Sequence, residues 1–215
     1  MSPPRRDPGR ADQILDAALR AFARLGFGSA RMDDVASESG LSKGALYLYF
    51  ASKDTLIEAL IARMVAFETR RLRDIAGSGG SAADRLLRFG DAFAAELVGL
   101  GPVAPMFPEA YARAMRHGRI RATFQAYLAT FRTELGGLIR EGIVAGEFRA
   151  TDADEAALGM AGLLEGLALL WTLDPERVPI ERASRAALGL QIDGLRLPGP
   201  VKGPASLTTP TAARP

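Results

Sequence analysis

Apolar residues recur at helical spacing through most of this 215-residue chain, and no segment alternates between apolar and polar residues as a half-buried strand does. The first stripe starts after Arg10 and ends at Gly26, a residue type that commonly closes a helix. A short amphipathic segment, "MDDVASES", follows. Ser42 and Ser52 are placed to cap two further helices, the second of which reaches about Ile75. Five more helical patterns lie at about 83–100, 104–117, 119–142, 153–173 and 181–195. The chain is therefore predicted to be all-α, with about nine helices.

Breaks in this pattern divide the chain into four parts. Residues 1–9 carry three prolines and two arginines, and we expect a flexible basic arm there. Residues 10–55 hold three short helices, which we expect to form a small helix-turn-helix domain. Residues 56–196 are expected to form a larger helical domain, with "GSGGS" at 77–81 as a loop. Residues 197–215 contain five prolines and little that a core would bury, so we expect a disordered tail.

The composition excludes several kinds of chemistry. The chain has no cysteine, so disulfides, zinc–cysteine sites and thiol catalysis are ruled out. It has one histidine, His117, which we place in the last turn of the helix at 104–117, before Gly118 ends that helix. No segment matches a metalloprotease, hydrolase, P-loop or dinucleotide-binding motif. We therefore expect a protein that is not an enzyme and that carries no metal and no organic cofactor.

Charge and hydropathy indicate the compartment. The formal net charge of +2 and the pI of about 9.2 neither require nor exclude a nucleic-acid partner. No apolar run approaches the roughly 18 residues of a membrane-spanning helix. The start of the chain, "MSPPRRDPGR", lacks the hydrophobic segment of a signal peptide. We expect a cytoplasmic protein with no membrane partner.

The segment "GLSKGALYLYF", Gly40–Phe50, places three aromatic residues within four positions. Successive residues on a helix point about 100° apart, so one helix starting after Ser42 cannot bury all of them. If Leu46 is turned inward, Phe50 shares its face and Tyr49 falls near the edge of that face. The outward surface then has Gly44 and Leu48 at its centre and Ala45 and Tyr47 beside them.

This segment lies within a longer signature. The stretch "GFGSARMDDVASESGLSKGALYLYFASKDTLIEAL", residues 26–60, closely resembles the signature of the TetR family of bacterial transcriptional repressors. The positions that match the family pattern are Phe27, Asp34, Val35, Ala36, Gly40, Leu41, Ser42, Lys43, Gly44, Leu46, Tyr47, Phe50, Lys53 and Leu56. The resemblance implies a homodimer whose two helix-turn-helix units bind a double-stranded DNA operator with approximate two-fold symmetry. It also implies a C-terminal domain that binds a small molecule, and this binding changes the distance between the two helix-turn-helix units.

The candidate DNA contacts surround the recognition helix. A glycine at position 44 lets the helix approach DNA closely, Leu48 suits thymine methyl groups, and Lys43 can reach a guanine edge or a phosphate. The resemblance adds phosphate contacts at the positions of Tyr47, Tyr49 and Lys53. The residues predicted to contact DNA are Arg31, Ser42, Lys43, Gly44, Ala45, Tyr47, Leu48, Tyr49 and Lys53.

Some of these assignments have structural alternatives. Tyr47 and Tyr49 would also suit packing against the first helix. Arg31 stands where the family usually has a Ser or Thr cap, and it is either a phosphate ligand or a solvated surface residue. Residues 1–60 carry eight basic and eight acidic residues, so affinity must come from the placement of charges. Because the recognition helix has no Arg, Asn or Gln, we expect sparse direct base reading, with DNA shape supplying much of the specificity.

Large apolar residues after position 60 define a candidate pocket. In the family, the helices that correspond to 53–75, 83–100, 104–117, 119–142 and 153–173 enclose the ligand. The predicted lining, which suits a largely apolar ligand, is Met64, Phe67, Phe89, Phe93, Met106, Phe107, Tyr111, Phe124, Tyr127, Phe131, Leu164 and Trp171. Each of these side chains would equally suit an ordinary core. Glu165 is unusual in its apolar surroundings, and an exposed edge is favoured for it over an arginine pair or a ligand contact.

Small residues near the C-terminus let helices approach closely. The candidate dimer interface consists of Gly159, Gly162, Gly166, Ala183 and Ala187, which resembles the four-helix interface of the family. The alternative is that these residues only ease packing within one chain. A second function also stays open, namely a DNA-binding dimer that senses no small molecule, for which a filled C-terminal core would be expected.

Overall fold

The computed structural model describes residues 8–196, so the predicted tail and all but the last two residues of the predicted arm lie outside the described part of the chain. The helices are α1 (Pro8–Ser29), α2 (Met32–Ser39), α3 (Lys43–Tyr49), α4 (Lys53–Ala76), α5 (Ala82–Leu100), the short 3-10 helix η1 (Gly101–Val103), α6 (Met106–Ala114), α7 (Gly118–Val144), α8 (Ala153–Leu173) and α9 (Ile180–Leu195). The all-α prediction is confirmed. Within residues 8–196, the one β-type pairing is an isolated bridge between Phe148 and Arg196.

Two boundaries differ from the expected ones. The first helix already begins at Pro8, because proline is well tolerated in the first turn, where its missing N–H has no partner to lose. The helix expected at 104–117 is α6, which ends at Ala114. His117 is the N-cap residue of α7 and Gly118 is the first residue of that helix, so the prediction of a last-turn histidine was wrong.

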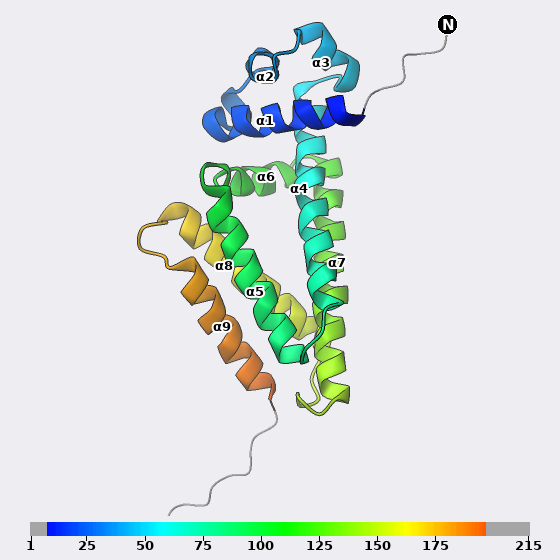
Figure 1. The fold of residues 1–215 in the computed structure, drawn as a ribbon, viewed down its shortest axis with the longest axis vertical. Helices are drawn as coiled ribbons and strands as arrows, with labels where there is room; N and C mark the ends of the chain where they lie inside the picture. The colour runs from blue at the N-terminus through cyan, green and yellow to red at the C-terminus, as the bar shows by residue number, and fades with distance from the viewer. Residues whose placement is uncertain (1–7, 197–215) are drawn as a thin grey trace, which may run out of the picture.

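The helices form a small group at one end of the molecule and a larger group below it (Figure 1). Helices α1, α2 and α3 lie together at the end, and α4 runs from them along the length of the larger group. Helix α7 packs alongside α4 and against α8, while α5 packs against α9. Helix α6 lies across the molecule just below α1, between the two groups (Figure 1).

The small group has a closed apolar core. Phe22, Phe27, Leu46 and Leu56 are almost completely buried there, and the rings of Phe22 and Phe27 meet edge to face at 5.3 Å. Gly26 interrupts the regular helix with φ of 74°, a left-handed conformation that favours glycine. This break turns the following residue, Phe27, into the space between α1 and the larger group.

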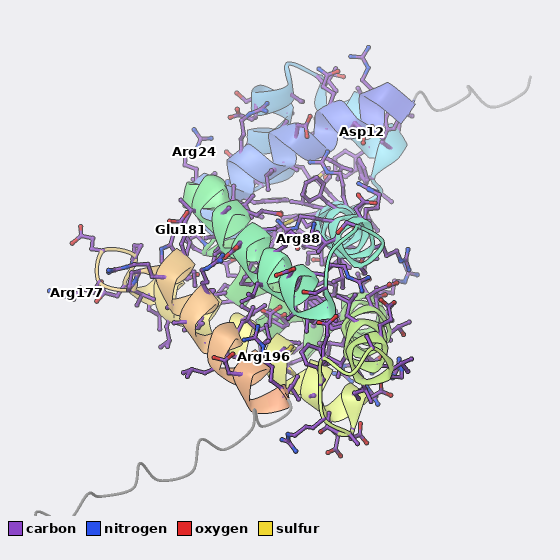
Figure 2. All side chains as sticks on the ribbon, turned by 60° about the horizontal axis from the view of Figure 1, so that its bottom comes forward. Asp12, Arg24, Arg88, Arg177, Glu181 and Arg196 are labelled. Carbon is purple, nitrogen blue, oxygen red and sulfur yellow. The ribbon has the colours of Figure 1, made fainter. Side chains whose placement is uncertain are left out.

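Charged side chains project outward around both groups, as the labelled residues in Figure 2 illustrate. Helix α8 is different, because exposed leucines occur along it, including Leu158, Leu170 and Leu173. It is the one helix in the described part of the chain that is long and apolar enough to cross a membrane by length and composition. Helix α8 nevertheless packs on α7 and α9, so it is part of the helical bundle, and its exposed leucines lie on the side that these two helices do not cover.

Candidate nucleic-acid interface and ligand cavity

Helix α3 presents an outward surface with the composition expected from its sequence. Leu46 is fully buried, whereas Leu48 is 64% exposed and Tyr47 is 44% exposed. Gly44 is exposed, and a methyl group added there would meet no atom within 4 Å. Ser42 caps the helix, since its hydroxyl oxygen accepts a hydrogen bond from the Ala45 N–H at 3.2 Å. The surface around Gly44 and Leu48 is therefore apolar and exposed.

Lys43 lies at the N-terminal end of this surface. Its ammonium group forms an ion pair with Asp33 of α2 at 2.8 Å, and both side chains are largely exposed. The hydrogen bond and the charge of Asp33 raise the pKa of Lys43. Exposed ion pairs contribute little to stability, so Lys43 can exchange Asp33 for a phosphate or a base edge at small cost.

Lys53, another predicted DNA contact, is engaged inside the protein. Its ammonium group donates to three backbone carbonyls at the end of α1, those of Phe27 (3.0 Å), Gly28 (3.0 Å) and Ala30 (2.9 Å). An ammonium group has three protons to donate. These bonds join the start of α4 to the end of α1, so a contact of Lys53 with a phosphate, which stays a prediction, would have to replace at least one of them.

The remaining predicted contacts lie at the margins of this surface. Arg31 is exposed at the N-cap position of α2, where its side chain makes no cap. Instead, its backbone N–H donates to the Asp34 carboxylate at 2.7 Å, and this hydrogen bond stabilises the first turn of α2. Ala45 is half-buried, and Tyr49 is half-buried against the core below. Tyr49 is thus less accessible to DNA than Tyr47.

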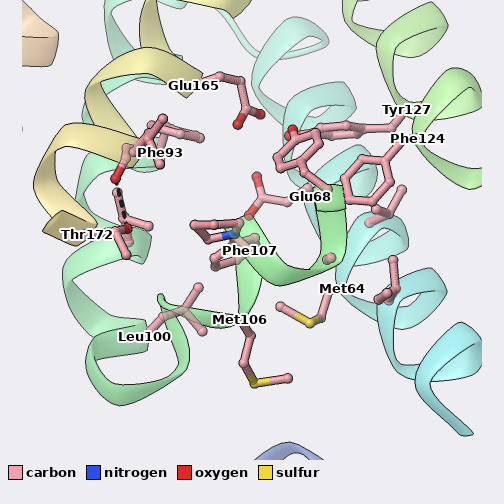
Figure 3. Close-up of a pocket in the computed structure, with 18 of the residues that line it drawn as sticks. Met64, Glu68, Phe93, Leu100, Met106, Phe107, Phe124, Tyr127, Glu165 and Thr172 are labelled. Atoms are coloured by element: carbon pink, nitrogen blue, oxygen red, sulfur yellow. Dashed lines mark hydrogen bonds between the residues drawn. The ribbon is translucent and has the colours of Figure 1, made fainter. Parts of the chain in front are cut away.

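The larger group of helices surrounds a cavity of about 600 Å³ between α4, α5, α6, α7 and α8, and the lining includes residues exposed at the surface, such as Met115 and Leu169. Seven of the twelve predicted pocket residues line it, namely Met64, Phe93, Met106, Phe107, Tyr111, Phe124 and Tyr127. Figure 3 shows several of these side chains around the open space. Its volume is in the range of cavities that hold drug-sized molecules.

The other five predicted pocket residues lie elsewhere: Phe67, Phe89, Phe131, Leu164 and Trp171. Phe67 is 52% exposed on the outer side of α4. Phe89, Phe131 and Leu164 are buried in the core, where the rings of Phe89 and Phe131 pack edge to face. Trp171 packs against a smaller cluster that includes Ile180.

The polar part of the lining is acidic. Glu68, Glu96 and Glu165 line the cavity, and its lining includes no lysine, arginine or histidine. Burial is the largest cause that raises the pKa of Glu165, and a hydrogen bond with Tyr111 opposes it. Glu165 is therefore partly buried in the cavity wall, which corrects the expectation of an exposed edge.

Glu68 and Glu96 share one arginine. Arg71 contacts Glu68 at 2.6 Å, also forms an ion pair with Glu96, and donates to the Ala92 carbonyl at 2.9 Å. Burial, together with the hydrogen bond to Glu96, raises the pKa of Glu68 to about 8. Two carboxyl groups with one guanidinium between them cannot both be fully compensated, so a proton remains on this pair near neutral pH.

Phe27 connects the cavity with the DNA-reading end of the molecule. This residue is part of the cavity lining, and its N–H donates to the Glu109 carboxylate of α6 at 2.7 Å. Arg113, also on α6, lies over the ring at 5.5 Å and pairs with Asp54 of α4 at 3.1 Å. We call Phe27, Lys53, Asp54, Glu109 and Arg113 the Phe27 junction, because they join α1, α4 and α6.

Sequence reasoning missed the acidic lining and most of this junction. Glu68 lies four residues after Met64, so helical spacing alone could have placed both on one face of α4. Glu109 and Arg113 have the same spacing on α6. Their partners at Phe27 and Asp54 are distant in sequence, and no local signal identifies them.

The predicted dimer residues lie mostly on accessible parts of α8 and α9. Gly159 and Gly162 are exposed, and Ala183 and Ala187 are partly exposed. Gly166 is exposed and also lines the cavity. Exposed leucines at Leu158, Leu170, Leu173 and Leu190 are found on the same two helices.

Comparisons with known proteins agree with this division into two parts. Residues 14–60 match the family model described as bacterial regulatory proteins, tetR family, and residues 82–195 match the model described as BetI-type transcriptional repressor, C-terminal. The chain is 26% identical over 206 residues to the HTH-type transcriptional repressor KstR2 of Rhodococcus jostii (strain RHA1), covering 92% of this chain and 99% of that protein.

Two solved structures share the fold. The transcriptional regulator FadR from Bacillus subtilis, in complex with stearoyl-CoA, aligns with a TM-score of 0.68 and 21% identity over 86% of this chain and 99% of that one. A protein from Saccharomonospora viridis in complex with choline aligns with a TM-score of 0.73 and 24% identity over 87% of this chain and 97% of that one. This protein therefore belongs to the TetR family of bacterial transcriptional regulators, which are DNA-binding proteins and not enzymes.

Proposed function

We propose that this protein is a homodimeric repressor that a small, largely apolar molecule releases from a two-fold symmetric DNA operator. The observation that carries this proposal is the position of Phe27, which belongs to the cavity lining while its backbone groups bind side chains of α4 and α6. A molecule in the cavity would press on a residue of the DNA-reading group itself. Its site of action would be the cytoplasm, where bacterial DNA is accessible.

The DNA-binding part of the proposal is supported by the outward surface of α3. Leu48 is exposed at the centre of a short helix, where no contact within the chain explains an apolar side chain. Gly44 beside it leaves the backbone bare, which suits close approach to a major groove. Tyr47, Lys43 and Arg31 surround this centre with groups that suit phosphate contacts.

Coupling between ligand and DNA would pass through α4 and α6. Helix α4 begins at Lys53 beside α1 and contributes Met64 and Glu68 to the cavity wall. Helix α6 contributes Met106 and also holds the Phe27 junction through Glu109 and Arg113. The α3 helices of the two copies must enter the major groove together, at half-sites about 34–36 Å apart. A shift of α4 or α6 would change the distance between the two α3 helices and so weaken their contacts with DNA.

The exposed faces of α8 and α9 support the proposed homodimer. Leu158, Leu170 and Leu173 on α8 and Leu190 on α9 are about half exposed or more in the single chain. Several exposed leucines on adjacent helices are more typical of an interface than of a free surface. The small residues of α8 and α9 would let the helices of the second copy approach closely.

A cavity of about 600 Å³ favours ligand sensing over a DNA-binding dimer without an effector. An unfilled core lowers stability, because its lining loses the packing contacts that neighbouring side chains would supply. The relatives solved with stearoyl-CoA and with choline support the use of this fold for small molecules of different chemistry.

The sharpest test of the DNA side is Gly44→Ala, with Gly137→Ala of α7 as its matched control. A methyl group meets no atom within 4 Å at either position, and alanine favours helices over glycine, so each variant should be about 0.5–1 kcal/mol more stable. Only Gly44→Ala should weaken DNA binding, by about tenfold or more, because its methyl group occupies space that the groove needs.

The DNA for this test would be selected from a random pool of duplexes with the wild-type protein, and affinities would be measured by fluorescence anisotropy. A homodimer should select inverted repeats with half-sites about one helical turn apart. Selected sequences without two-fold symmetry would contradict the proposed dimer. Equal DNA affinity of Gly44→Ala and the wild type would contradict the assignment of α3 as the reader.

A further inference from the structure

The charges around the cavity restrict the ligand more than its apolar surface does. Three glutamates are the only ionisable acids or bases in the lining besides its two tyrosines. Arg71 lies next to the lining but is already bound to Glu68, Glu96 and a backbone carbonyl. No described basic residue forms an ion pair with Glu165. With one proton on the Glu68–Glu96 pair and Arg71 bound to both, Glu165 is the acid of the lining that no described basic residue balances.

Glu165 is positioned as a ligand-binding group. It comes from α8 and lines the cavity together with Tyr111, which influences its pKa. Figure 3 shows the carboxyl groups of Glu165 and Glu68 both directed into the space between the aromatic rings. Burial without a positive partner raises the pKa of Glu165. A carboxyl group held in this way gains the most from a ligand that brings a positive charge.

Aromatic rings complete the surroundings of this carboxyl group. Phe93 and Phe107 lie on one side of the cavity in Figure 3, and Phe124 and Tyr127 lie on the other. Tyr111 and Phe124 are stacked with their ring centres 4.4 Å apart. The faces of aromatic rings attract cations, particularly where water is excluded. Met64, Met106 and Leu100 provide an apolar surface for the rest of the ligand.

We propose that the ligand is an organic cation with a long or bulky apolar body, whose positive group lies beside Glu165 and whose body fills the space toward α4 and α6. This inference rests on the proposed function, since it names the chemistry of the same ligand. A small cation alone would leave much of the roughly 600 Å³ empty. Anions such as fatty acids would place a negative charge beside Glu165, where the lining has no basic residue to balance it, and are disfavoured.

Three probes that share a decyl chain separate charge from apolar burial: decyltrimethylammonium, decan-1-ol and decanoate. Their affinities for the wild-type protein would be measured by isothermal titration calorimetry. The cation should bind at least about tenfold more tightly than the alcohol, and decanoate should bind most weakly. This comparison does not depend on the folding of any variant.

Glu165→Gln removes the charge while keeping the shape of the side chain. It should abolish the preference for the cation and leave the affinity for decan-1-ol within about twofold. Glu155→Gln is the matched control, because Glu155 lies on the same helix, is exposed, and is not part of the cavity lining. It should keep the preference of the wild type.

Three results would overturn the inference: equal affinity of the wild type for the cation and the alcohol, an unchanged preference in Glu165→Gln, or binding of none of the probes. Operator binding would be measured on the same samples. A protein that binds its operator but does not prefer the cation would refute the ligand class alone. A protein that prefers the cation but binds no DNA would refute the proposed function and leave the ligand class standing.

Discussion

The DNA-reading end and the cavity end of this molecule differ in whether their charged side chains have partners within the chain. Around the reader, Lys53 is satisfied by three carbonyls and Lys43 by Asp33, and Arg20 of α1 pairs with Glu38 of α2 at 2.8 Å. In the cavity, two carboxyl groups compete for Arg71, and Glu165 has no positive partner among the described residues. These basic groups of the helix-turn-helix unit have partners in the free protein. Glu165 in the cavity lacks a positive partner that a ligand could supply.

The same contrast holds for packing in the two parts of the molecule. Leu46→Ala removes a fully buried side chain from the closed core of the reader and should lower the free energy of unfolding by about 3 kcal/mol. Phe107→Ala removes a larger, partly exposed side chain that faces an existing cavity, and should cost only about 1 kcal/mol. Urea unfolding followed by circular dichroism measures both.

Leu48→Ala is the control within α3, because its side chain is exposed and its loss should leave stability unchanged. If the Phe107 variant lost as much stability as the Leu46 variant, the cavity would have to be packed in solution. The difference in packing between the helix-turn-helix core and the cavity would then not hold.

Two lysines offer the next test. Lys53→Met removes three hydrogen bonds between α1 and α4, and should lower the free energy of unfolding by about 2 kcal/mol. Lys43→Met breaks only an exposed ion pair, so it should not change stability measurably but should weaken operator binding. The opposite pattern, with Lys43 important for stability and Lys53 important only for DNA, would reverse the two assignments. Denaturant unfolding and DNA titration of both variants separate these outcomes.

A further prediction concerns the shared proton in the cavity. The pKa of Glu68 rises from an ordinary value of 4.5 to about 8 on folding, chiefly through burial. Between these values the folded chain holds a proton that the unfolded chain releases. The contribution of Glu68 to stability is therefore present below pH 4.5, falls as the pH rises, and is lowest above about pH 8.

Glu68→Gln should remove this decline, because glutamine stays neutral throughout. The difference in unfolding free energy between variant and wild type should then grow in favour of the variant from about pH 5 to pH 8. Thermal or urea unfolding at several pH values gives this difference directly. Parallel profiles for the two proteins would show that Glu68 does not carry the proton.

The reader could be predicted from the sequence in more detail than the cavity. Its outward surface depends on helical geometry within a few residues, and the opposite exposures of Leu46 and Leu48 follow from that geometry alone. Lys53 could not be assigned in this way, because its partners lie 23 to 26 residues away in the sequence. Its capping role depends on how α1 and α4 meet.

The position of the cavity could not be predicted from helical periodicity alone. A helical stripe shows which side chains face inward, but it does not show whether they meet a neighbouring helix or an open space. Phe124 and Phe131 on α7 both face inward, yet only Phe124 lines the cavity. The prediction of an exposed edge for Glu165 was wrong, because α8 is apolar on most sides and its sequence gives no clear outer face.

The place of Phe27 in the cavity wall has a thermodynamic consequence. If a ligand lowers the affinity for the operator through this residue, the operator must lower the affinity for the ligand by the same factor. Protein bound at its operator would then be a poorer receptor than protein free in the cell. Free copies would bind the ligand first, so a larger excess of protein over operator sites would raise the ligand concentration needed for induction.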